Sequence, residues 1–244
     1  MKIGIVGAGR VGSALARRFR ELQHTVLIAN SHGPETLRQV AYETGAIPVS
    51  ASGMANGVDL LVIAVPMKSI PLLPQNLLAN LPATSPVIDT GNYYPLRDGR
   101  IAELDAGMPQ AEWTSKILGR SVTKAFNNIY AQDLLQKGRP KGATGRFALP
   151  VSGNDIAQKR VVMELVEAVG FDALDVGALS ESWRYQPGTP AYAPDLTLQQ
   201  LRRLLQRANK IRAQLSTVLW SPGSWPTIPG LLFTAIWSGL RAPP

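Results

Sequence analysis

The sequence predicts an α/β fold: a doubly wound, mostly parallel sheet with a short C-terminal helical extension. Apolar runs of strand length alternate with segments of helical periodicity over most of the chain. A glycine-rich turn separates the first apolar run from the first helical segment. An amphipathic segment follows only after about residue 195. Strands that alternate with helices form parallel sheets with helices on the faces, which gives the predicted class.

Each element follows from a local pattern in the chain. We expect strands at residues 1–6, 24–29, 46–49, 59–65, 86–90, 121–126, 147–153 and 171–176. We expect helices at residues 11–22, 34–44, 69–79, 128–137 and 155–169. Asn154 or Asp155 can cap the last of these helices, and Gly170 ends it.

The chain divides near residue 194. Residues 1–194 are predicted to form the sheet domain with a small C-terminal appendage, and residues 195–244 an amphipathic helix followed by an apolar tail rich in tryptophan and proline. The tail carries no charge between Arg212 and Arg241, but three prolines break it into pieces too short to span a membrane. We expect the tail to make a homo-oligomer interface, with peripheral membrane contact as the alternative.

The turn "GAGRVG" has G-x-G-x-x-G spacing between the first strand and the first helix. Gly7 permits a tight turn, Gly9 lets backbone N–H groups approach a pyrophosphate, and Gly12 lets the helix pack closely on the strand. Strand, glycine turn, helix and second strand in this order predict a Rossmann-type dinucleotide site. The predicted pyrophosphate contacts are Gly7, Ala8, Gly9, Arg10, Val11 and Gly12.

The end of the second strand indicates which dinucleotide is bound. An acidic residue there would hold the ribose of NAD, but the chain has Asn30, Ser31 and His32. Hydrogen-bond donors in place of an acid favour the 2′-phosphate of NADP(H), and Arg10 could lie along the same pocket. The alternative is that Arg10 is a solvated charge and Ser31 merely caps the helix at 34–44.

Three further loops follow strands at the carboxyl edge of the predicted sheet, where ligands gather in such folds. We assign Ala64, Val65, Pro66, Gly91 and Asn92 to the cofactor, and Tyr93, Asn127 and Asn128 to the substrate. Asparagine amides both donate and accept hydrogen bonds, and a tyrosine face can stack on a planar ring. The alternative is that asparagine and proline serve the turns and that tyrosine packs in the core.

Composition removes several classes of function. The chain has no cysteine, which excludes disulfides, thiolate nucleophiles and cysteine-bound metals, and its two histidines lie at opposite ends of one predicted strand, so we expect no metal site. "MKIGIVGAG" is unlike a signal peptide, and a cytoplasmic location is expected. The net charge of +8 is dispersed and no nucleic-acid motif accompanies it, so an anionic small molecule is the expected partner and a nucleic acid is not.

A resemblance unites these motifs. The segments "IGIVGAGRVGSALA", "ANSHGP", "AVP", "DTGNYYP", "KAFNNIYAQDLL" and "SWRYQPGTPAY" resemble, in order and spacing, the NADP-dependent coenzyme F420 oxidoreductase family, which is also similar to the reductase domain of the STEAP ferric reductases. The resemblance covers roughly residues 1–195. It implies NADP(H) as cofactor and hydride transfer with F420, FMN or FAD as co-substrate. It also places Ser31 and His32 at the 2′-phosphate and Pro66 near the nicotinamide ribose.

The scarcity of acids and bases agrees with this chemistry. Hydride passing between two stacked redox rings needs mainly positioning, whereas oxidising an alcohol also needs a base. We therefore name no catalytic residue; Lys124 and Lys68 are the only lysines near the loops that could act as a base, and Lys124 is otherwise a strand-end charge. The predicted function is an NADP(H)-dependent oxidoreductase, and the alternative is a non-catalytic NADP-binding redox sensor or scaffold.

Overall fold

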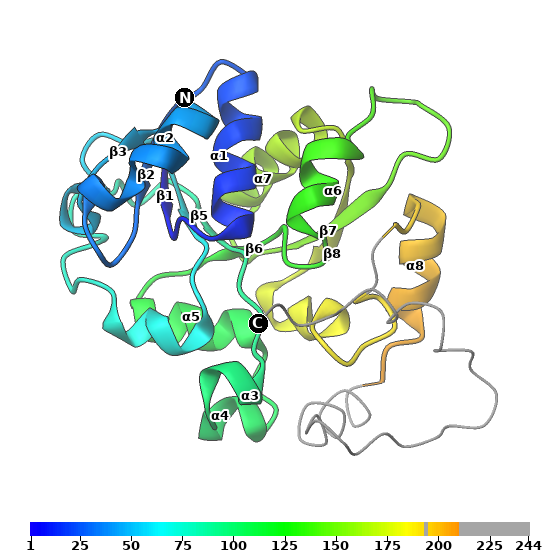
Figure 1. The fold of residues 1–244 in the computed structure, drawn as a ribbon. Helices are drawn as coiled ribbons and strands as arrows, with labels where there is room; N and C mark the ends of the chain where they lie inside the picture. The colour runs from blue at the N-terminus through cyan, green and yellow to red at the C-terminus, as the bar shows by residue number, and fades with distance from the viewer. Residues whose placement is uncertain (193–194, 210–244) are drawn as a thin grey trace.

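A single sheet of eight strands forms the centre of the computed structural model, which describes residues 1–192 and 195–209. The strand order is β3-β2-β1-β4-β5-β6-β7-β8, and all neighbours are parallel except β6 and β7 (Figure 1). The strands are β1 Lys2–Val6, β2 Thr25–Ala29, β3 Ile47–Pro48, β4 Leu60–Ile63, β5 Val87–Asp89, β6 Thr123–Lys124, β7 Ala148–Ser152 and β8 Asp172–Gly177. The predicted doubly wound, mostly parallel α/β class is confirmed.

Helices and short 3-10 turns connect the strands. The helices are α1 Arg10–Glu21, α2 Arg38–Thr44, α3 Pro95–Asp98, α4 Ala102–Asp105, α5 Gln110–Leu118, α6 Ala131–Gln136, α7 Ile156–Ala168 and α8 Leu198–Gln206. The 3-10 turns are η1 Pro34–Leu37, η2 Ala51–Gly53, η3 Met67–Leu72 and η4 Leu179–Tyr185.

Both faces of the sheet are covered, which is why its strands are nearly continuous apolar runs. Helices α1, α6 and α7 lie on one face, and α5 lies on the other (Figure 1). Successive residues alternate between the two cores: Ile5 joins the core under α1 and Val6 the opposite one. Burying one such side chain contributes about 1.5–3 kcal/mol to folding.

The pairing register brings the ends of the central strands to one edge. Val6 of β1 is level with Ala29 of β2 and with Ile63 of β4. Ile63 is in turn level with Asp89 of β5, and Asp89 with Lys124 of β6. The loops after these five strands therefore start side by side. Because strand order reverses between β1 and β4, this edge is where a ligand of such a sheet binds.

Three predicted elements are wrong or shortened. The helix expected at 69–79 is only the 3-10 turn η3, because Pro71 and Pro74 lack the N–H groups that an α-helix needs. The strand expected at 121–126 keeps only the two residues of β6, since Phe126 takes a positive φ of 60° that extended backbone does not allow. The helix expected at 128–137 begins at Ala131.

The helix caps test two expectations. Asp155 caps α7, and its carboxylate accepts a hydrogen bond of 2.9 Å from the Gln158 amide. Ser31, by contrast, caps no helix: its hydroxyl lies 3.2 Å from Nδ1 of His32, and η1 begins after Gly33 without a side-chain cap. The alternative role of Ser31 as a helix cap is therefore wrong.

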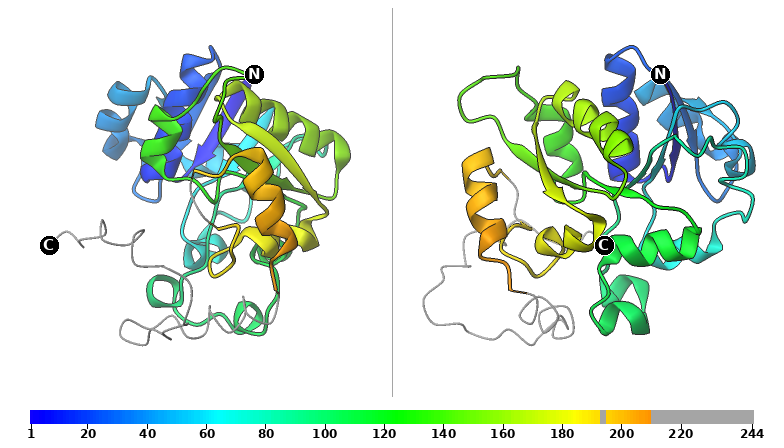
Figure 2. Two further views of the ribbon diagram at one scale, coloured as in Figure 1. Left: turned by 90° about the vertical axis from the view of Figure 1, so that its right-hand side faces the viewer. Right: turned by 180° about the vertical axis from the view of Figure 1, so that it is seen from behind.

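Helix α8 is the described part of the predicted amphipathic helix. Leu201 and Leu205 pack against Leu174 of β8 and Tyr185 of η4, so α8 lies against the end of the sheet (Figure 2). Thr197 and Gln200 form a capping box at its start. The remainder of the predicted helix and the apolar tail lie outside the described residues, and the division at residue 194 stays a prediction. Within the described ranges, no helix is long and apolar enough to cross a membrane.

Candidate functional site

The glycine turn after β1 is tight at two positions and open at the third. Gly7 has φ +112°, and a side chain there would collide with the Ala64 carbonyl; one at Gly12 would collide with the Gly7 carbonyl. Above Gly9, by contrast, no atom lies within 4 Å of where a Cβ would stand. Tight packing below and open space above are what the close approach of a pyrophosphate to this backbone requires.

Helix α1 presents uncapped amides at the same place. Its N-cap is Gly9, no side chain caps it, and its first turn holds no acidic residue. The first intrahelical bond runs from the Ser13 amide to the Gly9 carbonyl, at 2.9 Å. The preceding N–H groups at Arg10, Val11 and Gly12 have no intrahelical acceptor and lie at the positive end of the helix dipole. Ala8 and Val11 are partly exposed beside them, so an anionic group fits this turn.

The loop after β2 is held in shape by its asparagine. Asn30 accepts a hydrogen bond from the His32 amide at 2.9 Å and donates to the Thr36 hydroxyl at 2.8 Å. This leaves the Ser31 and His32 side chains exposed at the end of β2. Both can donate hydrogen bonds to a phosphate, which an acid at this position would repel.

Two charged side chains belong to the turn after β1 and to the loop after β2. Arg10 is exposed and makes no hydrogen bond or ion pair with a described residue. The Glu35 carboxylate folds over Gly33, where an added side chain would collide with it. The chain therefore places an exposed cation in the turn after β1, and an acid beside Gly33 in the loop after β2.

The loop after β4 supplies backbone rather than side chains. Ala64, Val65 and Pro66 are partly exposed and follow the last strand residue directly. The Ala64 amide is bound by the Val6 carbonyl at 2.8 Å, and the Pro66 carbonyl accepts from the Ser69 amide at 2.9 Å. Pro66 has no N–H, so this stretch offers a smooth apolar surface next to the glycine turn.

A buried ion pair lies under the loop after β5. Nζ of Lys124 is 3.0 Å from a carboxylate oxygen of Asp89, and the two side chains are 1% and 0% exposed. Lys124 also donates to the Gly91 carbonyl, while Asp89 accepts from the Gly91 amide at 2.7 Å. Burial lowers the pKa of Lys124, against the opposing effect of Asp89. Lys124 is the last residue of β6, in agreement with the expected strand-end charge, but it is buried and ion-paired rather than solvated.

Two predicted asparagines meet above this ion pair. The Asn92 amide nitrogen donates to the Asn127 carbonyl at 2.7 Å, and the Asn127 amide nitrogen donates to the Asn92 side-chain oxygen at 3.2 Å. Asn127 also donates to the Tyr185 carbonyl at 3.1 Å. Asn128 is buried beside it, and the side-chain oxygens of Asn127 and Asn128 find no donor among the described residues. The structure thus brings together the loops after β5 and β6 as the sequence suggested.

Tyr93 does not match its predicted role. Its side chain is 1% exposed and packs in a cluster with Met67, Leu104 and Trp113. Its hydroxyl lies 3.0 Å from Asp105 and accepts from the Ile101 amide at 3.0 Å, while burial raises its pKa. A ring enclosed in this way offers no face to a substrate, so the stacking role expected at Tyr93 is replaced by ordinary core packing.

Two other tyrosines lie at this edge: Tyr94, which the motif after the fifth strand also offers for stacking, and Tyr192, for which the sequence predicts no role. The hydroxyl oxygens of Tyr94 and Tyr192 are 2.5 Å apart, and the Asn92 amide lies 3.2 Å from Tyr192. Tyr94 follows Tyr93 directly and was part of the same motif. Tyr192 comes from the appendage about a hundred residues later, so no local pattern pointed to it.

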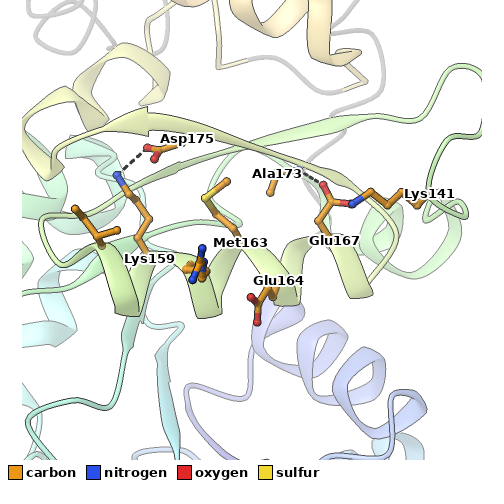
Figure 3. Close-up of a pocket in the computed structure, with 9 residues that line it drawn as sticks. Lys141, Lys159, Met163, Glu164, Glu167, Ala173 and Asp175 are labelled. Atoms are coloured by element: carbon orange, nitrogen blue, oxygen red, sulfur yellow. Dashed lines mark hydrogen bonds and ion pairs between the residues drawn. The ribbon is translucent and has the colours of Figure 1, made fainter.

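A hollow of about 460 Å³ lies elsewhere, between α7 and the edge strand β8 (Figure 3). Lys159 and Asp175 form an ion pair of 2.8 Å across it, and the Glu167 carboxylate accepts from the Ala173 amide at 2.9 Å. These side chains occupy the free edge of the sheet, which is how folds protect an edge strand from pairing with another chain. The hollow lies outside the carboxyl edge and holds none of the predicted site residues.

Comparison with known proteins supports the site. The family model described as NADP oxidoreductase, coenzyme F420-dependent, matches residues 2–93, which span the glycine turn and the loops after β2, β4 and β5. A solved structure of the hypothetical protein SMa0349 from Sinorhizobium meliloti is 31% identical, covering 81% of this chain and 94% of that one, with a TM-score of 0.65. A candidate F420-dependent NADP-reductase from Arthrobacter sp. FB24 is 25% identical, covering 75% of this chain and 87% of that one, with a TM-score of 0.62.

A curated relative matches a shorter stretch. The Escherichia coli protein YjhV is 41% identical over 71 residues, which are 29% of this chain and 52% of YjhV. The chain thus spans about half the length of this curated relative.

Proposed function

The chain belongs to the family of coenzyme F420-dependent NADP oxidoreductases, and we propose that it transfers a hydride between NADPH and a planar flavin-type acceptor such as F420, FMN or FAD. NADP-dependent oxidoreductase is the enzyme class that its family and fold support. One observation carries the choice of acceptor: the carboxyl edge combines an open dinucleotide turn with neutral amides, and the buried Lys124 beneath it is already ion-paired.

The cofactor half of the proposal follows from the loops after β1 and β2. The open backbone at Gly9 and the uncapped start of α1 suit the pyrophosphate. The exposed side chains of Ser31 and His32, and that of Arg10 in the preceding turn, suit a 2′-phosphate. NADP(H) is therefore the expected cofactor over NAD(H).

The acceptor half follows from the loops after β5 and β6. Bound NADPH supplies the hydride, and the chain has to hold two rings in register and exclude water. Asn92 and Asn127 lock the two loops together through reciprocal amide bonds. The Lys124 ion pair holds the Gly91 peptide from below. None of these tasks uses a titrating base, which agrees with ring-to-ring hydride transfer and disagrees with alcohol oxidation.

The test is turnover with defined acceptors. Purified protein is mixed with NADPH and, separately, F420, FMN, FAD or a ferric chelate, and the absorbance at 340 nm is followed. We expect NADPH oxidation with at least one ring acceptor. Tight NADPH binding with no turnover across the whole panel would contradict an enzyme and support the redox sensor.

Cofactor choice has its own measurement. Calorimetric titration should show NADPH binding at least about tenfold tighter than NADH, which is about 1.4 kcal/mol and within reach of one charge-assisted hydrogen bond. His32→Arg should tighten NADPH further and leave NADH unchanged, because arginine adds a permanent charge. Equal affinities of the wild type for the two cofactors would overturn the assignment of the β2 loop.

A further inference from the structure

A connected set of hydrogen bonds holds the loop after β2. The His32 amide donates to the side-chain oxygen of Asn30 at 2.9 Å, and the Asn30 amide nitrogen donates to the Thr36 hydroxyl at 2.8 Å. The Thr36 hydroxyl in turn donates to the Gly33 carbonyl at 2.7 Å. Thr36, for which the sequence predicts no role, therefore completes a network of contacts across this loop.

The direction of each bond is fixed by its partners. A backbone amide can only donate, so the atom of Asn30 that faces His32 is the oxygen, and its nitrogen faces Thr36. The Gly33 carbonyl can only accept, so the single proton of the Thr36 hydroxyl points to it. Asn30 and Thr36 therefore use these groups inside the loop and act on a ligand through the shape of the loop.

The loop needs this support at Gly33. The φ of +96° and ψ of 159° at Gly33 belong to a region that is essentially restricted to glycine. Because glycine has the widest choice of backbone conformations, contacts have to select this one. The Gly33 carbonyl accepts from the Thr36 hydroxyl and also from the Thr36 amide, the latter at 3.2 Å. Thr36 therefore fixes the backbone that directly follows His32.

The loop presents Ser31 and His32 to the outside. Both side chains are exposed, and the Ser31 hydroxyl lies 3.2 Å from Nδ1 of His32. Whichever of these two atoms donates to the other, one N–H or O–H group of the pair is left to donate elsewhere. Since the His32 amide is bonded to Asn30, the backbone that carries this pair is held by the same network.

The start of the loop is tied to the pyrophosphate turn. The Gly7 amide donates to the Ala29 carbonyl at 2.8 Å, and Asn30 follows Ala29 directly. A dinucleotide whose pyrophosphate lies on the glycine turn therefore has its adenosine ribose near the loop after β2. A change in the shape of this loop moves its donors relative to a 2′-phosphate and leaves the pyrophosphate contacts in place.

We propose that Thr36 and Asn30 are positioning residues that set the preference for NADP(H) over NAD(H), by holding Ser31 and His32 toward the 2′-phosphate. The group recognised is the phosphomonoester that NADP(H) carries and NAD(H) lacks. This proposal rests on the proposed function, because the phosphate belongs to the cofactor of that reaction. A merely structural network would stabilise the loop without distinguishing the two cofactors.

The test removes one hydroxyl and keeps the shape of the side chain. Thr36→Val loses both bonds of the Thr36 hydroxyl, whereas Thr36→Ser retains a hydroxyl. Thr44→Val is the matched control, because the Thr44 hydroxyl also bonds locally, but at the C-terminal end of α2. That hydroxyl donates to the Val40 carbonyl at 2.6 Å and accepts from the Ala46 amide at 3.2 Å. NADPH, NADH, adenosine 2′,5′-bisphosphate and AMP are titrated onto each protein by calorimetry.

The expected result is a selective loss. Thr36→Val should bind NADPH and adenosine 2′,5′-bisphosphate about tenfold more weakly, which corresponds to about one hydrogen bond to the phosphate. Its affinity for NADH and AMP should stay within about twofold of wild type. Thr36→Ser should keep most of the preference for NADPH, and Thr44→Val should keep all of it.

The outcomes separate this inference from the proposed function. A wild-type preference for NADPH that Thr36→Val retains, or equal losses of NADPH and NADH affinity in that variant, would overturn the inference and retain NADP(H) as cofactor. Equal affinities of wild type for the two cofactors would overturn both. A preference that depends on Thr36, in a protein that oxidises NADPH with no acceptor, would retain the inference and overturn hydride transfer. If Thr36→Val is thermally unstable, Asn30→Ala is measured in the same way and carries the same expectation.

Discussion

At the scale of single residues, the ion pair between Lys124 and Asp89 couples the stability of the sheet to the shape of the site. Both side chains are almost fully buried, and both also bond the Gly91 peptide. Removing one partner of a buried pair leaves an uncompensated charge, which costs about 3–5 kcal/mol. Removing both charges avoids that penalty. The pair therefore allows a structural role for Lys124 to be separated from a chemical one.

Lys124→Met should lower the free energy of unfolding by about 3–5 kcal/mol, because Asp89 remains buried without its cation. Lys124→Met/Asp89→Asn should recover most of this loss, since asparagine can still accept from the Gly91 amide. Urea unfolding measures the free energy of unfolding of both variants. Single-turnover hydride transfer in the folded double variant should stay within about tenfold of wild type, whereas loss of a general base costs about 10²-fold or more. A collapse of that rate with normal cofactor binding would identify Lys124 as a base.

At the scale of elements, the cofactor half of the site was predictable because its signals are local. The glycine turn and the acid-free end of β2 lie within about thirty residues of each other. Each is recognised from residue types at fixed spacing, without knowledge of distant contacts. The acceptor half was predictable only in part. The loop after β5 is irregular, so no helical or strand repeat indicates which of its two adjacent tyrosines faces the core. In the structure Tyr93 is buried and Tyr94 is partly exposed. Tyr192 meets Asn92 only through the tertiary fold.

Element ends depend on similarly non-local contacts. The Arg146 side chain, 3% exposed, joins the segment before β7 to the end of α7 and the start of β8. It contacts the Glu167 carboxylate at 2.7 Å and that of Asp172 at 2.5 Å. Burial alone would raise the pKa of Glu167, but the hydrogen bonds from Arg146 and from the Ala173 amide outweigh it and lower that pKa.

The direction of this shift predicts an acid-dependent loss of stability. A carboxylate whose pKa is lower in the folded state stabilises the fold above its ordinary pKa of 4.5, and this contribution disappears as the pH falls through the folded value. Arg146→Met should cost about 3 kcal/mol at pH 7. Its deficit relative to wild type should shrink as the pH falls from about 6 to 3. Urea unfolding across this range provides the measurement. Arg17→Met, which removes an exposed ion pair with Glu21, is the control. A deficit that does not change with pH would contradict the electrostatic role.

At the scale of the whole molecule, the candidate site is assembled from segments that lie far apart in the chain. The glycine turn lies in the first strand-helix unit, whereas the Tyr192 contact comes from the appendage that α8 follows. Helix α8 packs Leu201 and Leu205 on the sheet and leaves Arg202 and Arg203 exposed. The sequence continues from there into the uncharged run that ends at Arg241.

We propose that this C-terminal run forms a homo-oligomer interface, because its tryptophans and leucines would otherwise leave a large apolar surface in water. Truncation after Ser216 should then lower the oligomeric state or the solubility, as measured by light scattering. NADPH affinity should be unchanged, since every predicted cofactor contact lies between Gly7 and Asn92. Full-length protein that floats with liposomes, while the truncated protein does not, would contradict the interface and favour membrane contact. An unchanged mass and solubility, with no flotation, would exclude both roles and leave the cofactor site independent of the tail.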